Sequence, residues 1–184
     1  DRGLLVTVAI RDITERKLAE KKLQYLSTHD ALTELYNRTF FEEEIARLEH
    51  SRRFPVSVVI VDLNGLKQVN DLQGHAAGDA LLRRAAEVFR AAFRAEDMVA
   101  RIGGDEFAVF LPNTDEQAVV HTLERVDRML IAKNNEPNQM PLSFARGAAT
   151  AQRNESLAQA MLDADKRMYA DKQKHALNRS RSNS

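Results

Sequence analysis

Cysteine and tryptophan are absent from this 184-residue chain, and glycine and proline are scarce, at 7 and 4 residues. Without cysteine there is no disulfide, no thiolate zinc site and no cysteine nucleophile. The scarcity of glycine and proline argues against a fibrous or disordered chain. No apolar run approaches the roughly 20 residues that a membrane-spanning helix needs. These absences leave a globular protein whose chemistry must use oxygen ligands, amines and backbone groups.

An excess of either charge is also missing, because 27 lysine and arginine residues balance 27 aspartate and glutamate residues. This balance excludes a generally basic nucleic-acid-binding protein and a polyacidic tail, although it is compatible with a local patch of either sign. Apolar residues make up 43% of the chain, which is enough for a buried core. We therefore expect one domain with short extensions, no nucleic-acid partner and no membrane contact within this chain.

The N-terminal part differs in pattern from the rest. Residues 1–14 include a β-prone run over 3–10, which we interpret as the last strand of an upstream domain. Six of the eight residues in Glu15–Lys22 are charged, and apolar residues recur at helical spacing from there on. The pattern predicts a helix over 15–27. This helix is either an isolated surface helix or a short coiled-coil linker that pairs with a second copy of the chain.

Residues 28–174 alternate between helical and extended patterns, and a polar tail over 175–184 is expected to be flexible. The predicted elements are a helix over 39–50 opened by a capping box at Thr39, a strand over 56–61, a helix over 78–94, strands over 98–102 and 107–111, a helix from Thr114 to about 133, a strand over 142–149 and a last helix capped at Ser156. The order β-α-α-β-β-α-β-α with one central hairpin predicts an α+β, ferredoxin-like split βαβ fold with a mixed, mostly antiparallel sheet flanked by helices.

The first candidate site follows the buried strand over 56–61. Asp62 ends this strand, a glycine loop follows it, and Lys67 comes next. A carboxylate and backbone carbonyls suit Mg²⁺, while loop amides and a lysine suit phosphate oxygens. The alternative is that Asp62 simply caps the next helical turn.

The second candidate site is the hairpin turn Gly103–Glu106. Two glycines suit any tight turn, but Asp105 and Glu106 directly after them repel each other unless a cation is bound. In a split βαβ sheet this hairpin lies beside the strand that ends at Asp62, so Asp62 and Asp105 can share a metal. Together the two sites favour phosphoryl or nucleotidyl transfer.

Two polar residues between these sites suit a purine. Asn70 offers a donor and an acceptor, and Asp79 can accept from the N1–H and the exocyclic amine that guanine has and adenine lacks. The alternative for Asp79 is an acidic residue in the first turn of a helix. The interpretation as a base-binding pair predicts a preference for GTP over ATP.

Three separate motifs resemble those of the GGDEF family of diguanylate cyclases. Arg101–Phe107 is similar to the family signature, Asp30–Arg38 to its opening motif, and Asn70–Asp79 to a third conserved pattern of that family. The resemblance covers about residues 27–174, and residues 3–27 resemble the end of a PAS sensor domain with its linker helix. It implies a nucleotidyl-cyclase-like palm in a bacterial, cytoplasmic signalling protein with an upstream sensor in cis.

The resemblance implies that two GTP are condensed into cyclic di-GMP with release of two pyrophosphates, at a site shared across a homodimer. It implies a Mg²⁺ site, with Mn²⁺ as an alternative, made by Asp62, the Leu63 carbonyl, Asp105 and Glu106. Asp105 is the implied base for the ribose 3′-hydroxyl, and Lys67 and Glu106 assist catalysis. The implied substrate-binding residues are Leu66, Asn70, His75, Asp79 and Lys172.

Arg94–Asp97 resembles the RxxD product-inhibition site of the family, and Arg125 matches a second arginine that some members contribute from another domain. The alternative is a solvated ion pair at the end of a helix. The resemblance further implies that Asp30 and Arg38 pair and thereby attach the linker helix to the domain.

Three positions depart from the family pattern: Glu34 replaces a usual glycine, Asn64 a second aspartate, and Ala176 a phosphate-binding arginine. The missing arginine supports a second hypothesis, in which the chain is a weak or inactive domain that binds GTP or cyclic di-GMP and signals by contact. The presence of Asp62 and Asp105 favours the enzyme.

Overall fold

The structure is a computed structural model that describes residues 12–182. The β-prone run over 3–10 therefore lies outside the described residues. The elements are α1 (Thr14–Thr28), β1 (Tyr36–Asn37), α2 (Arg38–Glu49), β2 (Val56–Leu63), α3 (Leu66–Gln73), α4 (His75–Ala92), β3 (Met98–Arg101), β4 (Glu106–Pro112), α5 (Glu116–Asn134), β5 (Phe144–Ala151) and α6 (Leu157–Ser182).

The five strands form one sheet in the order β1-β3-β4-β2-β5. The β1–β3 pair is parallel, and the other three pairs are antiparallel. From β2 onward the strands and the long helices follow the predicted order, which confirms the mixed, mostly antiparallel sheet of a split βαβ fold. The short helix α3 between β2 and α4 was not among the helices predicted by residue range. The central hairpin of β3 and β4 lies beside β2, as expected.

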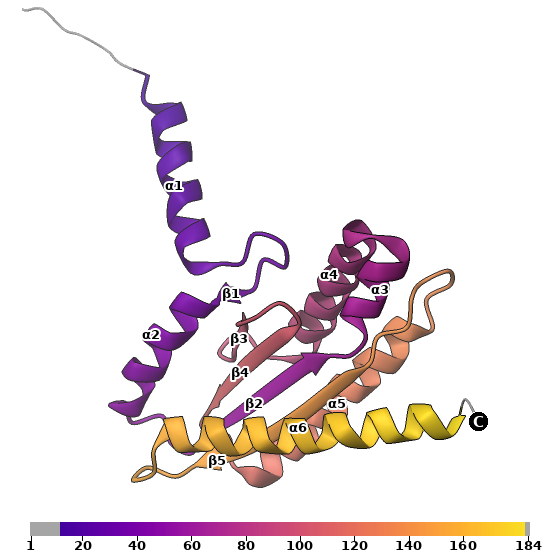
Figure 1. The fold of residues 1–184 in the computed structure, drawn as a ribbon. Helices are drawn as coiled ribbons and strands as arrows, with labels where there is room; N and C mark the ends of the chain where they lie inside the picture. The colour runs from indigo at the N-terminus through magenta and orange to yellow at the C-terminus, as the bar shows by residue number, and fades with distance from the viewer. Residues whose placement is uncertain (1–11, 183–184) are drawn as a thin grey trace, which may run out of the picture.

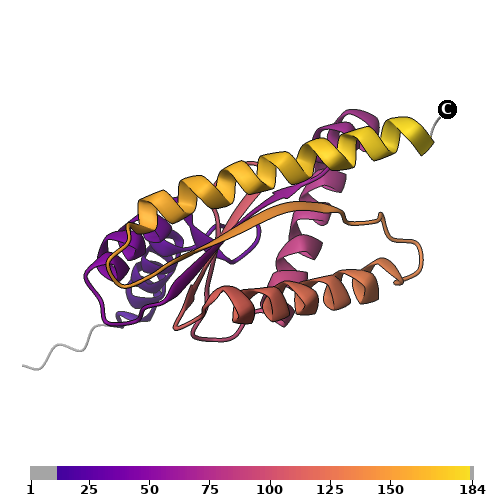
Figure 2. The same ribbon diagram turned by 90° about the horizontal axis from the view of Figure 1, so that it is seen from below.

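The sheet separates two hydrophobic cores. On one face, α3, α4 and α5 pack against β2 and β4 through side chains that include Val61, Phe89 and Phe107. On the other face, α2 and α6 pack through side chains that include Phe41 and Ala164. Figures 1 and 2 show α6 running along one face of the sheet and α5 along the other. All eight residues of β2 are buried, which explains why its sequence up to Asp62 is apolar except for Ser57, whose hydroxyl is hydrogen-bonded to the Thr114 carbonyl.

Local differences from the predicted elements have simple causes. Asn37, not Thr39, caps α2, since its side chain accepts from the Phe40 amide; the predicted capping box is wrong. The two-residue strand β1 has no pattern of its own and exists because it pairs with β3. The last helix continues to Ser182 rather than ending before the polar tail.

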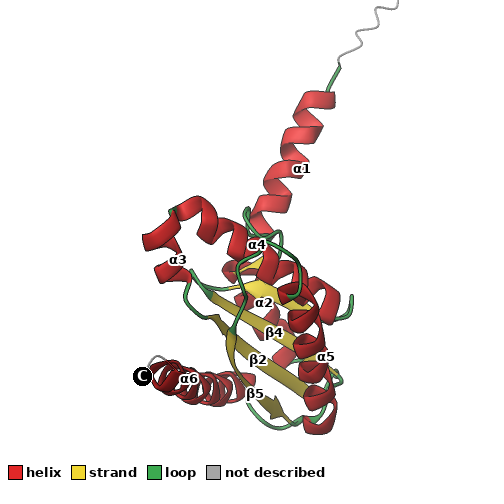
Figure 3. Ribbon diagram, turned by 90° about the vertical axis from the view of Figure 1, so that its right-hand side faces the viewer, coloured by secondary structure: helices red, strands yellow, loops and turns green. Residues whose placement is uncertain are grey.

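Helix α1 projects away from the domain (Figures 1 and 3). None of its residues is buried, and the side chains of Leu18 and Leu23 are 61% and 69% exposed. A helix with several largely exposed leucines is compatible with a segment that packs against a partner, and the linker interpretation stays a prediction. Within residues 12–182, no helix is long and apolar enough to cross a membrane.

Candidate active site

The register of two strands brings the two candidate sites together. Asp62 of β2 lies directly opposite Glu106 of β4, and the Leu63 amide donates to the Asp105 carbonyl oxygen at 2.8 Å. The carboxylate after the buried strand and the two carboxylates of the hairpin turn therefore lie at the same end of the sheet. This juxtaposition follows from the split βαβ topology.

Asp62 is buried, at 3% exposure, and carries an ion pair on one oxygen only. Its Oδ2 accepts from Lys172 Nζ on α6 at 2.6 Å. Its Oδ1 is buried and has no hydrogen-bond partner among the described residues. A buried carboxylate oxygen without a partner is costly unless a ligand or ion completes it.

The acidic surroundings keep Lys172 protonated. Partial burial by itself lowers the pKa of this lysine, but the hydrogen bond and charge of Asp62, with the charges of Asp105 and Glu106, raise the pKa above its ordinary value. The Lys172 ammonium is thus the cation that balances the acidic end of the sheet in this structure. The same lysine was expected to bind phosphate, and the structure places it beside Asp62.

The oxygen donors at this end of the sheet suit Mg²⁺, which does not need a coordination shell made entirely of protein ligands. In the described part of the chain, no group of three or more histidine, aspartate or glutamate side chains is gathered for a metal ion. Mg²⁺ needs only one or two carboxylates, because it retains water and binds substrate phosphates. Oδ1 of Asp62, which has no hydrogen-bond partner in the described residues, with the Leu63 backbone next to it and Asp105 in the adjacent hairpin turn, fits that requirement.

The hairpin turn depends on its first glycine. The Glu106 carbonyl accepts from the amides of Ile102 and Gly103, which closes the turn. A Cβ at Gly103 would come within 2.6 Å of Glu106 Oε2, so the Glu106 side chain folds back over this position. Asp105 is half-buried, whereas Glu106 is exposed.

Helices α3 and α4 carry the residues expected to bind a base. Asn70 Oδ1 is buried and unpartnered within the described chain, and Asp79 is half-buried. His75 and Lys67 are exposed. The side chain of Leu66 is buried in the core, so chiefly its backbone is available to a ligand. Asn70 Oδ1 is thus a buried hydrogen-bond acceptor without a partner among the described residues.

The glycines of this region allow its close packing. Gly65 and Gly74 have φ angles of 83° and 82°, which permit the turns at the two ends of α3. A Cβ at Gly78 would lie 2.0 Å from Asn70 Oδ1. Only glycine at position 78 therefore leaves room for the amide of Asn70.

The three residues expected to bind product gather near the C-terminal end of α4. The Arg94 amide donates to Asp97 Oδ2 at 2.8 Å, and the guanidinium of Arg94 is exposed. Arg125 Nε donates to the Ala92 carbonyl, and its Nη2 is buried without a partner among the described residues. Burial raises the pKa of Asp97 above its ordinary value, and the nearby Glu96 adds to this effect.

The pairing of Asp30 with Arg38 is wrong. Asp30 pairs with Arg101 at 3.2 Å, and Arg38 pairs instead with Glu42 on its own helix at 2.8 Å. Arg38 is the first residue of α2, and its side chain is 72% exposed. The role of Arg101 was missed, although it stands two residues before the glycine pair of the family signature.

Two departures from the family pattern have structural explanations. Glu34 has a φ angle of 58°, in the left-handed region where glycine carries no steric cost, which accounts for the usual glycine. Asn64 donates through its side chain to Ser143 Oγ at 3.1 Å and through its backbone to the Ser143 carbonyl. Asn64 therefore holds the segment before β5 through both its side chain and its backbone.

Comparison with known families agrees with this geometry. The family model "Diguanylate cyclase, GGDEF domain" matches residues 27–178. The chain belongs to the GGDEF family. The match covers the Gly103–Glu106 turn, both helices with the expected base-binding residues, and α6 as far as residue 178. The family membership of this GGDEF domain and its strand topology therefore both show the fold that the sequence predicts.

Curated relatives of this GGDEF domain include named cyclases. It is 39% identical over 125 residues to the probable diguanylate cyclase DgcE of Escherichia coli K12, which covers 65% of this chain and 11% of that protein. It is 31% identical over 171 residues to diguanylate cyclase DgcM of the same organism, covering 91% of this chain and 42% of that protein. The chain thus spans less than half the length of these relatives.

Solved structures share the fold. The coiled coil and GGDEF domain of DgcB from Caulobacter crescentus, in complex with c-di-GMP, matches with a TM-score of 0.77 at 25% identity over 88% of each chain. Diguanylate cyclase SiaD from Pseudomonas aeruginosa, in complex with its activator SiaC, matches with a TM-score of 0.74 at 26% identity, covering 88% of this chain and 64% of that chain.

Proposed function

We propose that this GGDEF domain is an active diguanylate cyclase that condenses two GTP into cyclic di-GMP with release of two pyrophosphates. The observation that carries the proposal is the buried, half-satisfied carboxylate of Asp62, set opposite the Asp105 turn and neutralised by Lys172. This arrangement has the charges that a metal-bound triphosphate needs. The curated relatives named as diguanylate cyclases support it.

Each residue has a definite task in this proposal. Asp62, the Leu63 carbonyl and Asp105, assisted by Glu106, would hold Mg²⁺ or Mn²⁺, which when bound supplies positive charge to the phosphates and lowers the pKa of the attacking hydroxyl. Asp105 accepts the proton of the ribose 3′-hydroxyl as this oxygen bonds to the α-phosphorus of the second GTP. Pyrophosphate then leaves with the electrons of the broken P–O bond.

The remaining residues bind and orient the substrate. The Asn70 amide can both donate to and accept from the guanine edge, and the Asp79 carboxylate accepts from the N1–H and the exocyclic amine of the base, with Leu66 and His75 next to them. Lys67 and Lys172 place positive charge on the phosphates. Lys172 is half-exposed, with 44% of its side chain accessible, so it can turn from Asp62 to a phosphate without unfolding the end of α6.

The reaction needs two copies of the domain, because one bound GTP must attack the other. We propose a homodimer held in part by α1, whose exposed leucines would pair with their counterparts, and controlled by an upstream sensor in cis. In this scheme residues 1–14 end that sensor, 15–27 link it to the catalytic domain over 28–174, and 175–184 follow the domain.

The test of the function is turnover of GTP by the purified chain with Mg²⁺, followed by quantification of cyclic di-GMP and pyrophosphate in a ratio of one to two. The chain is assayed alone and fused to a dimeric coiled coil in register with α1. Binding of GTP without any product from the fused dimer would favour the alternative, a binding domain that signals by contact.

Gly78→Ala is expected to raise the KM for GTP about tenfold with little change in kcat. The added Cβ would displace the Asn70 amide, whose Oδ1 lies 2.0 Å from its position, and one lost hydrogen bond weakens binding by about 1.5 kcal/mol. Steady-state kinetics measures both parameters. Ala91→Ser, at an exposed position of the same helix, is the control. An unchanged KM would contradict the role of Asn70 in binding guanine.

Product inhibition is a second proposed property of this domain. Asp97 and the buried, unpartnered Nη2 of Arg125 lie near the end of α4, next to the exposed guanidinium of Arg94. Arginine groups suit the phosphates and guanine faces of cyclic di-GMP, and a carboxylate suits the guanine edge.

Arg94→Ala is expected to leave the initial rate intact and to raise the inhibition constant for cyclic di-GMP by about tenfold or more, because one charge-assisted contact is lost. Initial rates at increasing product concentration measure this constant. Arg153→Ala removes the same charge from an exposed loop and is expected to change nothing. Equal inhibition of both variants would exclude the assignment of this site.

A further inference from the structure

Arg101 joins two parts of the chain that the family motifs list separately. It is the last residue of β3, and its side chain is only 16% exposed. Its Nη1 donates to both carboxylate oxygens of Asp30, at 3.2 and 3.3 Å. Its Nη2 and Nε donate to the Gly104 carbonyl, at 2.8 and 3.3 Å. One guanidinium therefore connects the loop after α1 to the hairpin turn Gly103–Glu106, which is the catalytic turn of the proposed function.

The Asp30 end of this connection is well ordered. Asp30 lies two residues after the end of α1, and its Oδ1 also accepts from the amide and the hydroxyl of Thr33, at 2.8 and 2.6 Å. Partial burial alone would raise the pKa of Asp30, but the hydrogen bonds from Thr33 and the charge of Arg101 lower it below its ordinary value. Asp30 thus stays ionised at neutral pH and holds its partner.

The turn end of the connection bears directly on Asp105. The Gly104 carbonyl belongs to the peptide group before Asp105, and Arg101 holds it. The Asp105 carbonyl belongs to the peptide group after Asp105, and the Leu63 amide holds it at 2.8 Å. With both flanking peptide planes held, the backbone angles of Asp105 are set, and with them the direction of its Cα–Cβ bond, from which the carboxylate extends.

Gly104 makes this support necessary. A Cβ at Gly104 would meet no described atom within 4 Å, so the tip of the turn is open on the side where a side chain would lie. Glycine also resists neither sign of φ. Without Arg101 the peptide plane before Asp105 is therefore free to rotate.

We propose that Arg101 is a positioning residue that orients the Asp105 carboxylate and couples this orientation to the end of the linker helix through Asp30. The proposal rests on the diguanylate cyclase function proposed for this site. A displacement of the loop after α1 moves Asp30, Asp30 moves the guanidinium, and the guanidinium moves the peptide before Asp105. This coupling reaches the catalytic turn through side-chain hydrogen bonds in a single domain.

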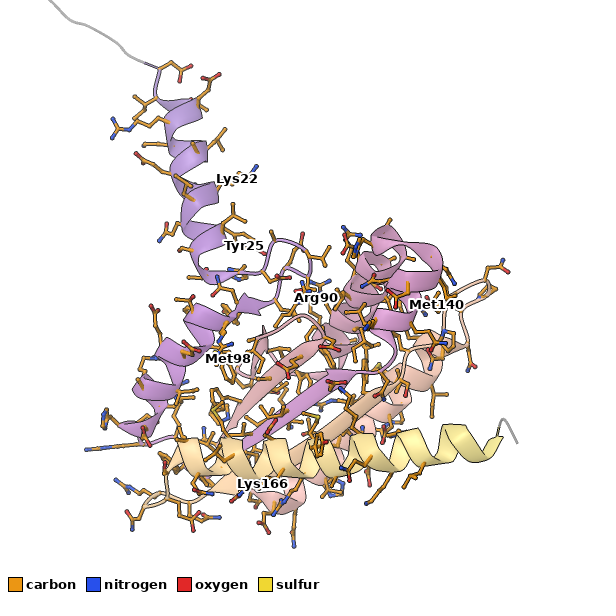
Figure 4. The ribbon with its side chains drawn as sticks, viewed as in Figure 1. Lys22, Tyr25, Arg90, Met98, Met140 and Lys166 are labelled. Carbon is orange, nitrogen blue, oxygen red and sulfur yellow. The ribbon has the colours of Figure 1, made fainter. Side chains whose placement is uncertain are left out.

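The experiment compares three variants of the full chain. Arg101→Lys keeps the positive charge, but one ammonium cannot hold both the Asp30 carboxylate and the Gly104 carbonyl with the same geometry. The charge swap Asp30→Arg with Arg101→Asp restores an ion pair but has no donor for Gly104. Arg90→Gln is the matched control, since Arg90, labelled in Figure 4, donates to the Thr33 carbonyl at 2.8 Å and so holds the same loop. Among the described residues, its hydrogen bond and its ion pair go to Thr33 and Glu34 and not to the Gly103–Glu106 turn.

Arg101→Lys is expected to lower kcat about tenfold while the KM for GTP stays unchanged, because the base-binding helices are not touched. The charge swap is expected to leave kcat as low as in Arg101→Lys, although it restores an ion pair between positions 30 and 101. Arg90→Gln is expected to lower stability and keep kcat. Recovery of kcat by the charge swap, or a normal kcat for Arg101→Lys, would show that Arg101 is only a structural ion pair.

Amide hydrogen exchange of Leu63 gives a second readout that needs no turnover. This amide donates to the Asp105 carbonyl, so its protection reports the order of the turn. We expect about tenfold faster exchange in Arg101→Lys and wild-type exchange in Arg90→Gln. Equal protection in both variants overturns the inference. An inactive wild-type chain with the expected exchange pattern would instead count against the proposed function alone.

Discussion

Asp105→Ala is expected to lower the rate of cyclic di-GMP formation by about 1,000-fold or more, since it removes both the base for the 3′-hydroxyl and a metal ligand. The fold is expected to survive, because the hydrogen bond from the Leu63 amide goes to the backbone carbonyl of this residue. The measurement combines a product assay at saturating GTP with a thermal melt.

A matched control separates chemistry from charge. Asp163→Ala removes a carboxylate from the exposed surface of α6, where it pairs only with Lys166 and Gln159 in the described structure, and is expected to keep full activity. If Asp105→Ala retained more than about a tenth of the wild-type rate at normal stability, Asp105 would be neither base nor metal ligand, and the proposed mechanism would fail.

Gly147→Ala is expected to destabilise the domain by about 3 kcal/mol, an effect in the range of strong overpacking. A Cβ at this position of β5 would lie 2.1 Å from the Ala164 carbonyl oxygen and 2.2 Å from the Met168 amide nitrogen. Both are backbone atoms of α6, so the whole helix must move. Lys172 lies one turn after Met168, and its ion pair with Asp62 is expected to be lost as well.

Denaturant unfolding measures this loss of stability, and a glycine in the turn between β3 and β4 provides the control. Gly104→Ala adds the same methyl group where nothing lies within 4 Å, and is expected to change the free energy of unfolding by less than about 0.5 kcal/mol. Wild-type stability of Gly147→Ala would mean that α6 does not pack on the backbone of β5 as closely as described.

Much of this site was predictable because its parts are local in sequence. The largely apolar run Val56–Val61 predicts a buried strand, and Asp62, directly after this run, then has to lie close to the end of β2. The hairpin with Gly103–Glu106 has to lie near that end once the split βαβ order is recognised. For Asn70 and Asp79, residue chemistry suggested a guanine-binding pair but left a helix-start alternative open for Asp79, and the resemblance to the GGDEF family favoured the guanine-binding interpretation; their roles stay predictions.

The long-range pairs were not predictable in the same way. The partner of Asp30 is 71 positions away and the partner of Asp62 is 110 positions away. Arg38 is much nearer to Asp30 in sequence, yet α2 turns its side chain to Glu42 and to solvent. A carboxylate pairs with the cation that packing brings within reach, and packing depends on how helices and strands cross rather than on sequence distance.

The sequence by itself determined the order of the main elements, the family and the candidate site residues. It could do so because hydrophobic periodicity and motif spacing are read from short stretches of the chain. Only the tertiary structure decided which charges meet: Lys172 neutralises Asp62, Arg101 joins Asp30 to the catalytic turn, and Gly147 lets α6 approach closely enough for the first of these. Ion pairs form between atoms a few ångströms apart, and that proximity exists only after the sheet and its helices have packed.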